Sequence, residues 1–289
     1  MVKTHPVLRG LRAGLLALIA GALFLPVGES WAQQAPGADW WSAIDRDDAS
    51  AVRGLLLRNV DPNAFGKQGN PALIQAIRDQ SWAVFDALRV APGVQIDEPN
   101  AHDETALMYL CILGQTDRAS DLIAAGAHVN RLGWTPLHYA ASKGRVETAR
   151  MLIKRGAIVN APGPDGTTPL MMAALSGSKP MVELLLAQKA DPTMFNLAHE
   201  TAADWARKRK NTDIAQRLDE AASRRGAERQ LGVEGGSSAP AAVSRPSVPA
   251  ATVTPSAPAA APSSGAPQAG DQSSFSRYFD LGRFDQPAK

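Results

Sequence analysis

The chain has 289 residues, a formal net charge of +2 and a single cysteine. So small a net charge gives no strong attraction to nucleic acid, and we expect no nucleic-acid partner. One cysteine cannot form an intramolecular disulfide, so no disulfide can stabilise the monomer. We expect Cys111 to be a small buried residue. The alternative is a reactive or intermolecular thiol.

Residues 1–32 have the pattern of an export signal. A basic start precedes the apolar run GLLALIAGALFLPV, and Ser30 and Ala32 stand at the −3 and −1 positions of a cleavage site. A helix of this length spans about 21 Å, less than the ~30 Å hydrocarbon core of a bilayer. We therefore expect cleavage after Ala32, a periplasmic or secreted mature protein, and no membrane association after cleavage. The alternative is an uncleaved N-terminal anchor.

A repeated pattern fills residues 33–225. Its clearest starting motifs are TALMYLC at Thr105, TPLHYAA at Thr135 and TPLMMAA at Thr168. Related sequences begin at 71 and 201, and a degenerate one begins at 38. From 71 onwards the starts are separated by 34, 30, 33 and 33 residues. Periods of this length indicate a repeat architecture in which each unit packs only on its neighbours.

Each unit is predicted to be a pair of short antiparallel helices. The starting Thr can cap the first helix, and Pro suits the first helical position. The small Ala side chains that follow allow neighbouring helices to approach closely, and Leu pairs in the second helix should bury against the next unit. Gly93, Gly126 and Gly156 stand where the second helix should end in a left-handed residue.

The segment GWTPLHYAASKGRVETARMLIKRGAIVN resembles an ankyrin repeat. The resemblance extends over about residues 38–224 and implies an all-α fold: a curved solenoid of about six helix pairs, with β-hairpin fingers along one edge. In that family the fingers and first helices line a concave surface that binds other proteins. The resemblance therefore implies a non-enzymatic interaction scaffold whose degenerate terminal units act as caps.

Few residues of this sequence could act in catalysis or bind a metal, and we expect no catalytic, cofactor or metal site. The resemblance gives His138 a structural role, with hydrogen bonds to the Thr that starts its helix and to a neighbouring loop. A catalytic His would need a nucleophile or a carboxylate within reach of its ring, and the sequence has none at a spacing that indicates such a pairing. No metal-binding, phosphate-binding or nucleophile-elbow motif is present either. We interpret Asp45, Asp47 and Asp48 as a solvated turn, and the basic run 207–210 as part of a soluble cap.

Ankyrin repeats vary most at the finger tips, at the residue before the starting Thr, and at the pair after Ala-Ala. Counting from the degenerate unit at 38, units three to five carry apolar residues at several of these positions. We expect an interface there with an apolar centre and a polar rim. The alternative is partial burial under neighbouring fingers. The predicted protein-binding residues are Tyr109, Ile112, Leu113, Trp134, Tyr139, Lys143, Met172 and Leu175.

One link between units is short. Eight residues separate Asn160 from Thr168, but only five separate Asn130 from Thr135. Loop length changes folding free energy little, about 0.6 kcal/mol per doubling. We therefore expect an effect on shape: a notch in the finger row, with Trp134 exposed beside it.

The C-terminal region differs in composition. Residues 226–270 are rich in Pro, Ala and Ser and are predicted to be a disordered linker. Residues 271–289 then carry four aromatic residues within ten positions: Phe275, Tyr278, Phe279 and Phe284.

This aromatic pattern is typical of a short motif that folds on a partner or on the repeats themselves. Docking on the repeats would make the chain self-regulating or self-associating. The alternative is a functionless end. A small-molecule carrier or enzyme accessory factor remains a further alternative for the whole chain, but it would need a convergent polar pocket.

Overall fold

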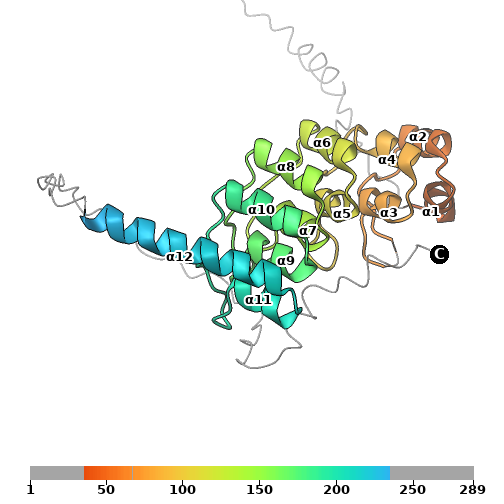
Figure 1. Cartoon of the computed structure of the whole chain (residues 1–289). Coiled ribbons are helices and arrows are strands. Elements are labelled where there is room, and N and C mark those ends of the chain that lie inside the picture. The colour runs from red at the N-terminus through yellow and green to blue at the C-terminus, as the bar shows by residue number, and fades with distance from the viewer. Residues whose placement is uncertain (1–35, 67, 235–289) are drawn as a thin grey trace, which may run out of the picture.

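The computed structural model describes residues 36–66 and 68–234 (Figure 1). The predicted signal and the aromatic motif lie outside the described residues, as does the predicted linker from 235 onwards. Within the described part, helices follow one another in pairs, one pair per repeat. Their bounds are α1 Ala38–Asp45, α2 Ala49–Leu57, α3 Ala72–Arg78, α4 Trp82–Leu88, α5 Ala106–Leu113, α6 Thr116–Ala124, α7 Pro136–Ser142, α8 Val146–Lys154, α9 Pro169–Ser176, α10 Lys179–Ala187, α11 Ala202–Lys208 and α12 Thr212–Glu234.

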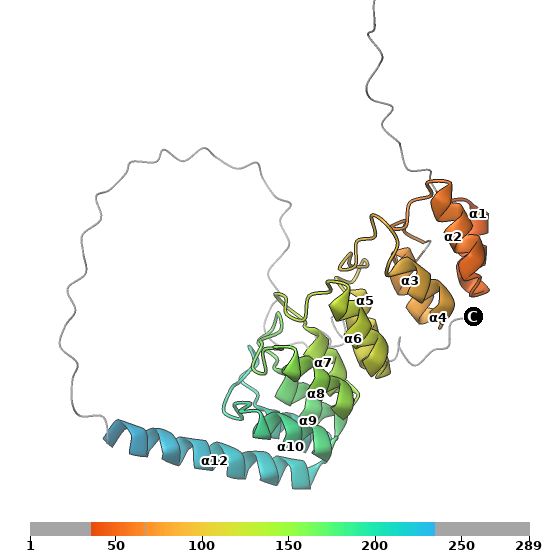
Figure 2. The same ribbon diagram turned by 90° about the horizontal axis from the view of Figure 1, so that it is seen from above.

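The helices form two layers. The first helices of successive units pack side by side, α1 on α3 and so on to α11, and we call them the inner helices. The second helices, α2 to α12, form the outer layer, and each packs on the inner helix of its own unit. Figure 2 shows the pairs in a bent row with loops along one edge. The predicted all-α solenoid of six helix pairs is confirmed.

The starting Thr residues cap the inner helices as predicted. Each has an extended backbone and exchanges contacts with the residue three positions on; they are Thr105, Thr135, Thr168 and Thr201. Pro136 and Pro169 follow two of them at the first helical position, where no amide hydrogen is needed. Capping of this kind satisfies orphan amides at the start of each helix.

Left-handed residues end the inner helices. Gly114, Gly144 and Gly177 hold this position in the three central units, with φ of 77°, 61° and 72°. The other units place side chains there, on Asp47, Gln80 and Lys210, with φ of 54°, 57° and 62°. Positive φ is found at Gly93, Gly126 and Gly156. The prediction that such a glycine ends the outer helix is confirmed for Gly126 and Gly156, but α4 ends at Leu88, five residues before Gly93.

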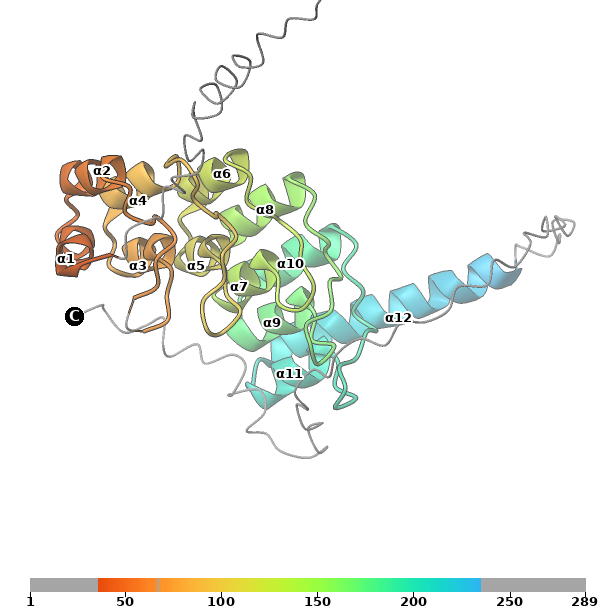
Figure 3. The same ribbon diagram turned by 180° about the vertical axis from the view of Figure 1, so that it is seen from behind.

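The loops that precede the inner helices project along one edge (Figure 3). We call them the fingers and define them as 60–70, 94–104, 127–134, 157–167 and 190–200. Extended pairing in the described residues is limited to two isolated bridges, Phe65 with Pro71 and Phe195 with Thr201. The expected β-hairpins are therefore tight turns that lack an extended strand ladder in this part of the chain.

A continuous core runs between the two layers. It contains the predicted Leu and Ala positions of the inner helices, such as Leu137, Ala140 and Ala141. Cys111 is fully buried, and burial raises the pKa of its thiol. The expectation of a small buried cysteine is confirmed.

The last helix is longer than the sequence suggested. α12 continues through Gly226 to Glu234, so the predicted linker boundary at 226 is placed too early. Arg225 and Arg229 lie 3.0 and 2.9 Å from the Asp191 carboxylate, which begins the last finger. These ion pairs hold the extension of α12 beside the base of that finger. No helix of the described segments has the length and apolar character needed to span a bilayer.

Candidate protein-interaction site

A row of partly exposed side chains crosses the C-terminal ends of the inner helices. Leu113 ends α5, Lys143 follows α7 and Leu175 lies in the last turn of α9, and all three are half-buried. Since α5, α7 and α9 pack side by side, these positions are expected about 8–10 Å apart from one unit to the next. We call these three residues the inner-helix row. They are the part of the predicted interface that the fold places together at the surface.

Charged side chains continue the row at both ends. Arg78 and Asp79 occupy the corresponding positions of α3, and Lys208 and Arg209 those of α11. Within the row, Lys143 on α7 stands between Leu113 and Leu175, and protein interfaces usually combine apolar and charged side chains.

Four of the predicted interface residues are buried, so the expectation that they are exposed is wrong. The inner helices are covered on two sides by their neighbours and on a third by the outer layer. Positions that face those neighbours cannot reach a partner in the folded protein. The residues concerned are Tyr109, Ile112, Tyr139 and Met172.

Two of these buried residues hold a carboxylate inside the solenoid. Glu104 is fully buried, and Tyr109 and Tyr139 donate hydrogen bonds to it at 3.0 and 2.8 Å. The Asn100 side-chain amide donates a third at 3.1 Å. A buried carboxylate needs such donors, because its removal from water is costly. Glu104 and its donors therefore bind unit three to unit four.

The sequence interpretation missed Glu104 as a buried residue, although a signal was present. The same spacing of five residues recurs in the last unit, where Trp205 donates from Nε1 to Glu200 at 2.8 Å. An acidic residue before the helix and an aromatic donor in its second turn therefore form a recurring pair. Burial raises the pKa of Tyr109 to about 12, and the Glu104 charge adds to the rise. The phenol thus remains a donor at neutral pH.

Trp134 is half-buried, not exposed beside an open notch as predicted. Its ring packs edge-on against His138, with 5.2 Å between ring centroids. On the other side, a Cβ added to Gly163 would lie 3.0 Å from the indole, so the next finger covers it closely. The exposed apolar residue of the short finger is Leu132. Arg131 ties that finger back to Asp103 at 2.6 Å.

His138 has the structural role that the resemblance implied. It is fully buried, and its Nδ1 accepts a hydrogen bond from the Thr135 amide at 3.1 Å. Its Nε2 lies 3.0 Å from the Thr167 carbonyl, so the proton belongs on Nε2. Burial lowers the pKa of His138 to about 4, although the bond to the Thr167 carbonyl opposes this shift. The ring is therefore neutral near pH 7.

Four of the other polar groups considered from the sequence have hydrogen-bond or ion-pair partners within the repeats. Asp47 accepts from the Val84 amide at 2.8 Å, and Asp48 caps α2 by accepting from Ala51 at 2.9 Å. In the basic run, Arg207 pairs with Asp204 and Asp219, at 2.7 and 2.6 Å, and Lys208 pairs with Glu200. These contacts agree with a turn at one end and a cap at the other.

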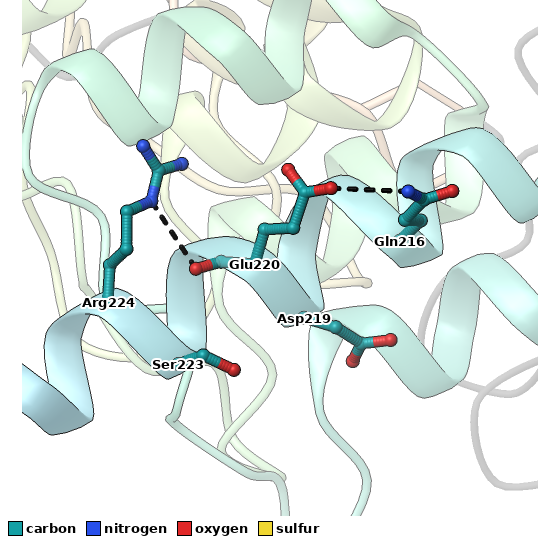
Figure 4. Close-up of a pocket in the computed structure, with 5 residues that line it drawn as sticks. All are labelled: Gln216, Asp219, Glu220, Ser223 and Arg224. Atoms are coloured by element: carbon teal, nitrogen blue, oxygen red, sulfur yellow. Dashed lines mark hydrogen bonds between the residues drawn. The ribbon is translucent and has the colours of Figure 1, made fainter.

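A shallow hollow on α12 offers little to a ligand. The five side chains that line it come from one helix (Figure 4). Two of the contacts in Figure 4 are internal to that helix, from Gln216 to the Glu220 carboxylate at 3.2 Å and from Arg224 to the Glu220 carbonyl at 3.4 Å. Across the described residues, no three His, Cys, Asp or Glu side chains gather as they would around a metal ion.

Comparison with known proteins identifies the repeats. Residues 73–163 match the family model "Ankyrin repeats (3 copies)", and residues 165–197 match "Ankyrin repeat". Protein glp-1 of Caenorhabditis elegans is 28% identical over 59% of this chain and 14% of its own length. The B-cell lymphoma 3 protein homolog of Mus musculus is 27% identical over 56% of this chain and 38% of its own length. The chain thus spans well under half the length of these relatives.

The solved structure of the ankyrin repeat domain of Bcl-3 is 26% identical in sequence to this chain. It superposes with a TM-score of 0.53, covering 60% of this chain and 79% of that structure. Residues 73–163 and 165–197 of this chain are therefore ankyrin repeats.

Proposed function

We propose that this protein is an exported, non-enzymatic scaffold that binds a protein partner through the inner-helix row. The observation that carries the proposal is the position of Leu113 on α5 and Leu175 on α9, which stay partly exposed on either side of Lys143 on α7. Charged residues follow on the helices beyond them. Ankyrin repeats generally act as protein-binding modules, and their stacked units present extended binding surfaces.

The chemistry of the row indicates what such a partner should offer. Covering the part of each Leu that remains exposed would contribute at most about 1 kcal/mol per side chain. The charged ends of the row would fix the partner's orientation and speed its association. We therefore expect a partner with a small apolar patch flanked by charges.

A pair of substitutions tests this site without disturbing the fold. Leu113→Lys combined with Leu175→Lys replaces both apolar members of the row with charged side chains. The chain itself carries Lys143 and Lys208 at the corresponding positions of other units, so the helices accept this residue there. The double variant should lose at least tenfold in capture of its partner from the native extract, while its melting temperature stays within a few degrees of wild type.

The matched control carries the same charges on the outer layer. Ala124 and Ala187 are exposed and end α6 and α10. Ala124→Lys with Ala187→Lys should capture the same proteins as wild type. Equal capture by both double variants would reject the inner-helix row as the binding site.

Export rests on the sequence of residues 1–32. The proposal predicts that the mature protein begins at Gln33 and is found in the periplasm or medium. Fractionation followed by N-terminal sequencing tests it, and a cytoplasmic protein beginning at Met1 would contradict it.

A further inference from the structure

Exposed apolar side chains form a second surface, at the tips of three successive fingers. Leu132 is 94% exposed, Phe195 is 59% exposed and Leu197 is 76% exposed. The exposed Pro164 of the intervening finger lies between them in the chain. We call these four residues the fingertip strip.

Contacts between fingers make the strip continuous. A Cβ added to Gly133, next to Leu132, would lie 3.6 Å from Pro164 Cγ. Leu197 donates its amide to the Asp165 carbonyl at 2.8 Å. The three fingers are therefore joined through neighbouring residues, and their apolar side chains share one edge of the solenoid.

Helix α12 lies beside the base of the last finger of this edge. Its ion pairs from Arg225 and Arg229 to Asp191 hold it against the base of the 190–200 finger. Figure 2 shows α12 running past the fingers on the side where they project, and Figure 3 shows its far end extending beyond the solenoid. The helix ends at Glu234, about 8 Å beyond Arg229 at 1.5 Å per residue. The chain therefore leaves α12 a short distance beyond the base of the last finger.

The chain after Glu234 is long enough to return. About 40 residues separate Glu234 from Phe275, and a random-coil chain of that length would have an r.m.s. span of roughly 35 Å. Tethering at this distance gives an effective concentration in the millimolar range, so a weak contact can be well occupied.

We propose that the aromatic segment 275–284 docks on the fingertip strip of its own chain. Phe275, Tyr278, Phe279 and Phe284 supply large apolar rings, and the strip supplies exposed apolar partners for them. The sequence alone placed this docking in a notch beside Trp134, but the next finger covers that indole. The strip lies at the opposite end of the inner helices from Leu113 and Leu175, so this inference is independent of the proposed function.

Disulfide trapping in the full chain tests the proposal without any partner. The natural Cys111 is fully buried, so it does not compete with introduced thiols. Ser274→Cys is combined with Ala198→Cys, which is exposed in the last finger. The control combines Ser274→Cys with Ala187→Cys, which is exposed at the end of α10. Docking predicts that the intramolecular disulfide forms at least tenfold faster at 198 than at 187.

A tail variant separates docking from chance proximity. Phe275→Ala, Tyr278→Ala and Phe279→Ala together remove three rings and leave the tether unchanged. In the Ser274→Cys, Ala198→Cys background, this variant should lower the rate to that of the 187 control. The proposal would be overturned if the disulfide formed at equal rates at 198 and 187, or if its rate at 198 were unchanged when the three rings are removed. Disulfide-linked dimers without the intramolecular product would also overturn it, in favour of self-association.

Discussion

At the scale of single residues, the third position after the starting Thr of an inner helix has a structural role, even where it carries a His. His138, Met108 and Met171 each stand three residues after a starting Thr. Their Nδ1 or Sδ atoms accept a hydrogen bond from that Thr amide, at 3.1, 3.4 and 3.4 Å. The position therefore requires an acceptor, and His138 additionally reaches the Thr167 carbonyl of the next finger.

This arrangement predicts a loss of stability in acid. The pKa of His138 is about 4 in the folded protein and about 6.5 when unfolded, so the unfolded chain binds the proton more tightly. The stability that neutral His138 supports is complete above about pH 6.5 and is lost as pH falls toward 4. Between pH 7 and 4.5 the loss should be roughly 2–3 kcal/mol.

The sister units supply the control. His138→Met gives unit four the residue of units three and five and removes the titrating group. Urea unfolding at pH 7 and 4.5 should show a smaller drop for this variant than for wild type by roughly 2 kcal/mol. Identical drops would contradict the assignment of a buried neutral ring.

The buried Glu104 predicts a cost for losing a single hydroxyl. Tyr139→Phe keeps the ring but removes a donor to the carboxylate, and hydrogen bonds to charged groups contribute about 1.5–3 kcal/mol. Chemical denaturation should show a loss of that size. Glu104→Gln combined with Tyr139→Phe should cost less than the two single changes added together, because they share one interaction. Simple additivity would argue against the network.

The limits of sequence interpretation are clearest at these residues. Helix α5 has the sequence ALMYLCIL, which is apolar on every side, so no polar face distinguishes buried Ile112 from half-exposed Leu113. Glu104 was not predicted to be buried because a carboxylate is normally exposed, and one of its donors, Tyr139, comes from the next unit. The role of His138 was predictable, since it depends on local spacing within one repeat.

At the scale of elements, the left-handed residues that end the inner helices predict a difference in stability between Gly and other residues at that position. Gln80 is exposed at a position where the three central units use Gly, with φ of 57°. Gln80→Gly should raise the free energy of unfolding by about 0.5–1 kcal/mol, because a side chain is strained there. Thermal or urea unfolding measures this change.

The opposite substitution is the control. Gly114→Ala places a Cβ 2.9 Å from the Arg145 side chain at a φ of 77°, so it should destabilise the protein by at least about 1 kcal/mol. If neither Gln80→Gly nor Gly114→Ala changed the free energy of unfolding, the left-handed ends of the inner helices would not be strained.

The extension of α12 depends on the Asp191 carboxylate. Burial opposes its ionisation, but the hydrogen bonds from Thr193 and the charges of Arg225 and Arg229 outweigh this and hold the pKa of Asp191 below its usual value. Asp191→Asn should therefore increase hydrogen exchange in residues 222–234 several-fold. Glu220→Gln, on the exposed side of the helix, should leave exchange there unchanged. Similar exchange in both variants would show that the ion pairs do not hold the helix.

The end of α12 could not be predicted from local pattern. Gly226 suggests a break, yet one Gly inside a helix costs only about 1 kcal/mol relative to Ala. Its compensation comes from Asp191, which lies more than 30 residues earlier in the chain. The paired helices, in contrast, follow from Thr caps and Gly ends within each unit.

At the scale of the whole molecule, the architecture can be predicted from the repeat period of the sequence alone. Each unit packs only on its neighbours, so a period near 33 residues predicts the stack directly. Which side chains are exposed at the surface cannot be predicted from the repeat period. It depends on which side chains the adjoining units leave uncovered, such as Leu113, Leu175 and the exposed Leu132.

The most direct test of the account is photo-cross-linking in intact cells. A photo-reactive amino acid is placed at position 113 or 175 in the inner-helix row, and at 124 or 187 on the outer layer as the control. The account predicts covalent adducts to the same partner protein from 113 and 175 and none from 124 or 187. Adducts from the outer positions alone, or none from 113 and 175, would contradict partner binding through the inner helices.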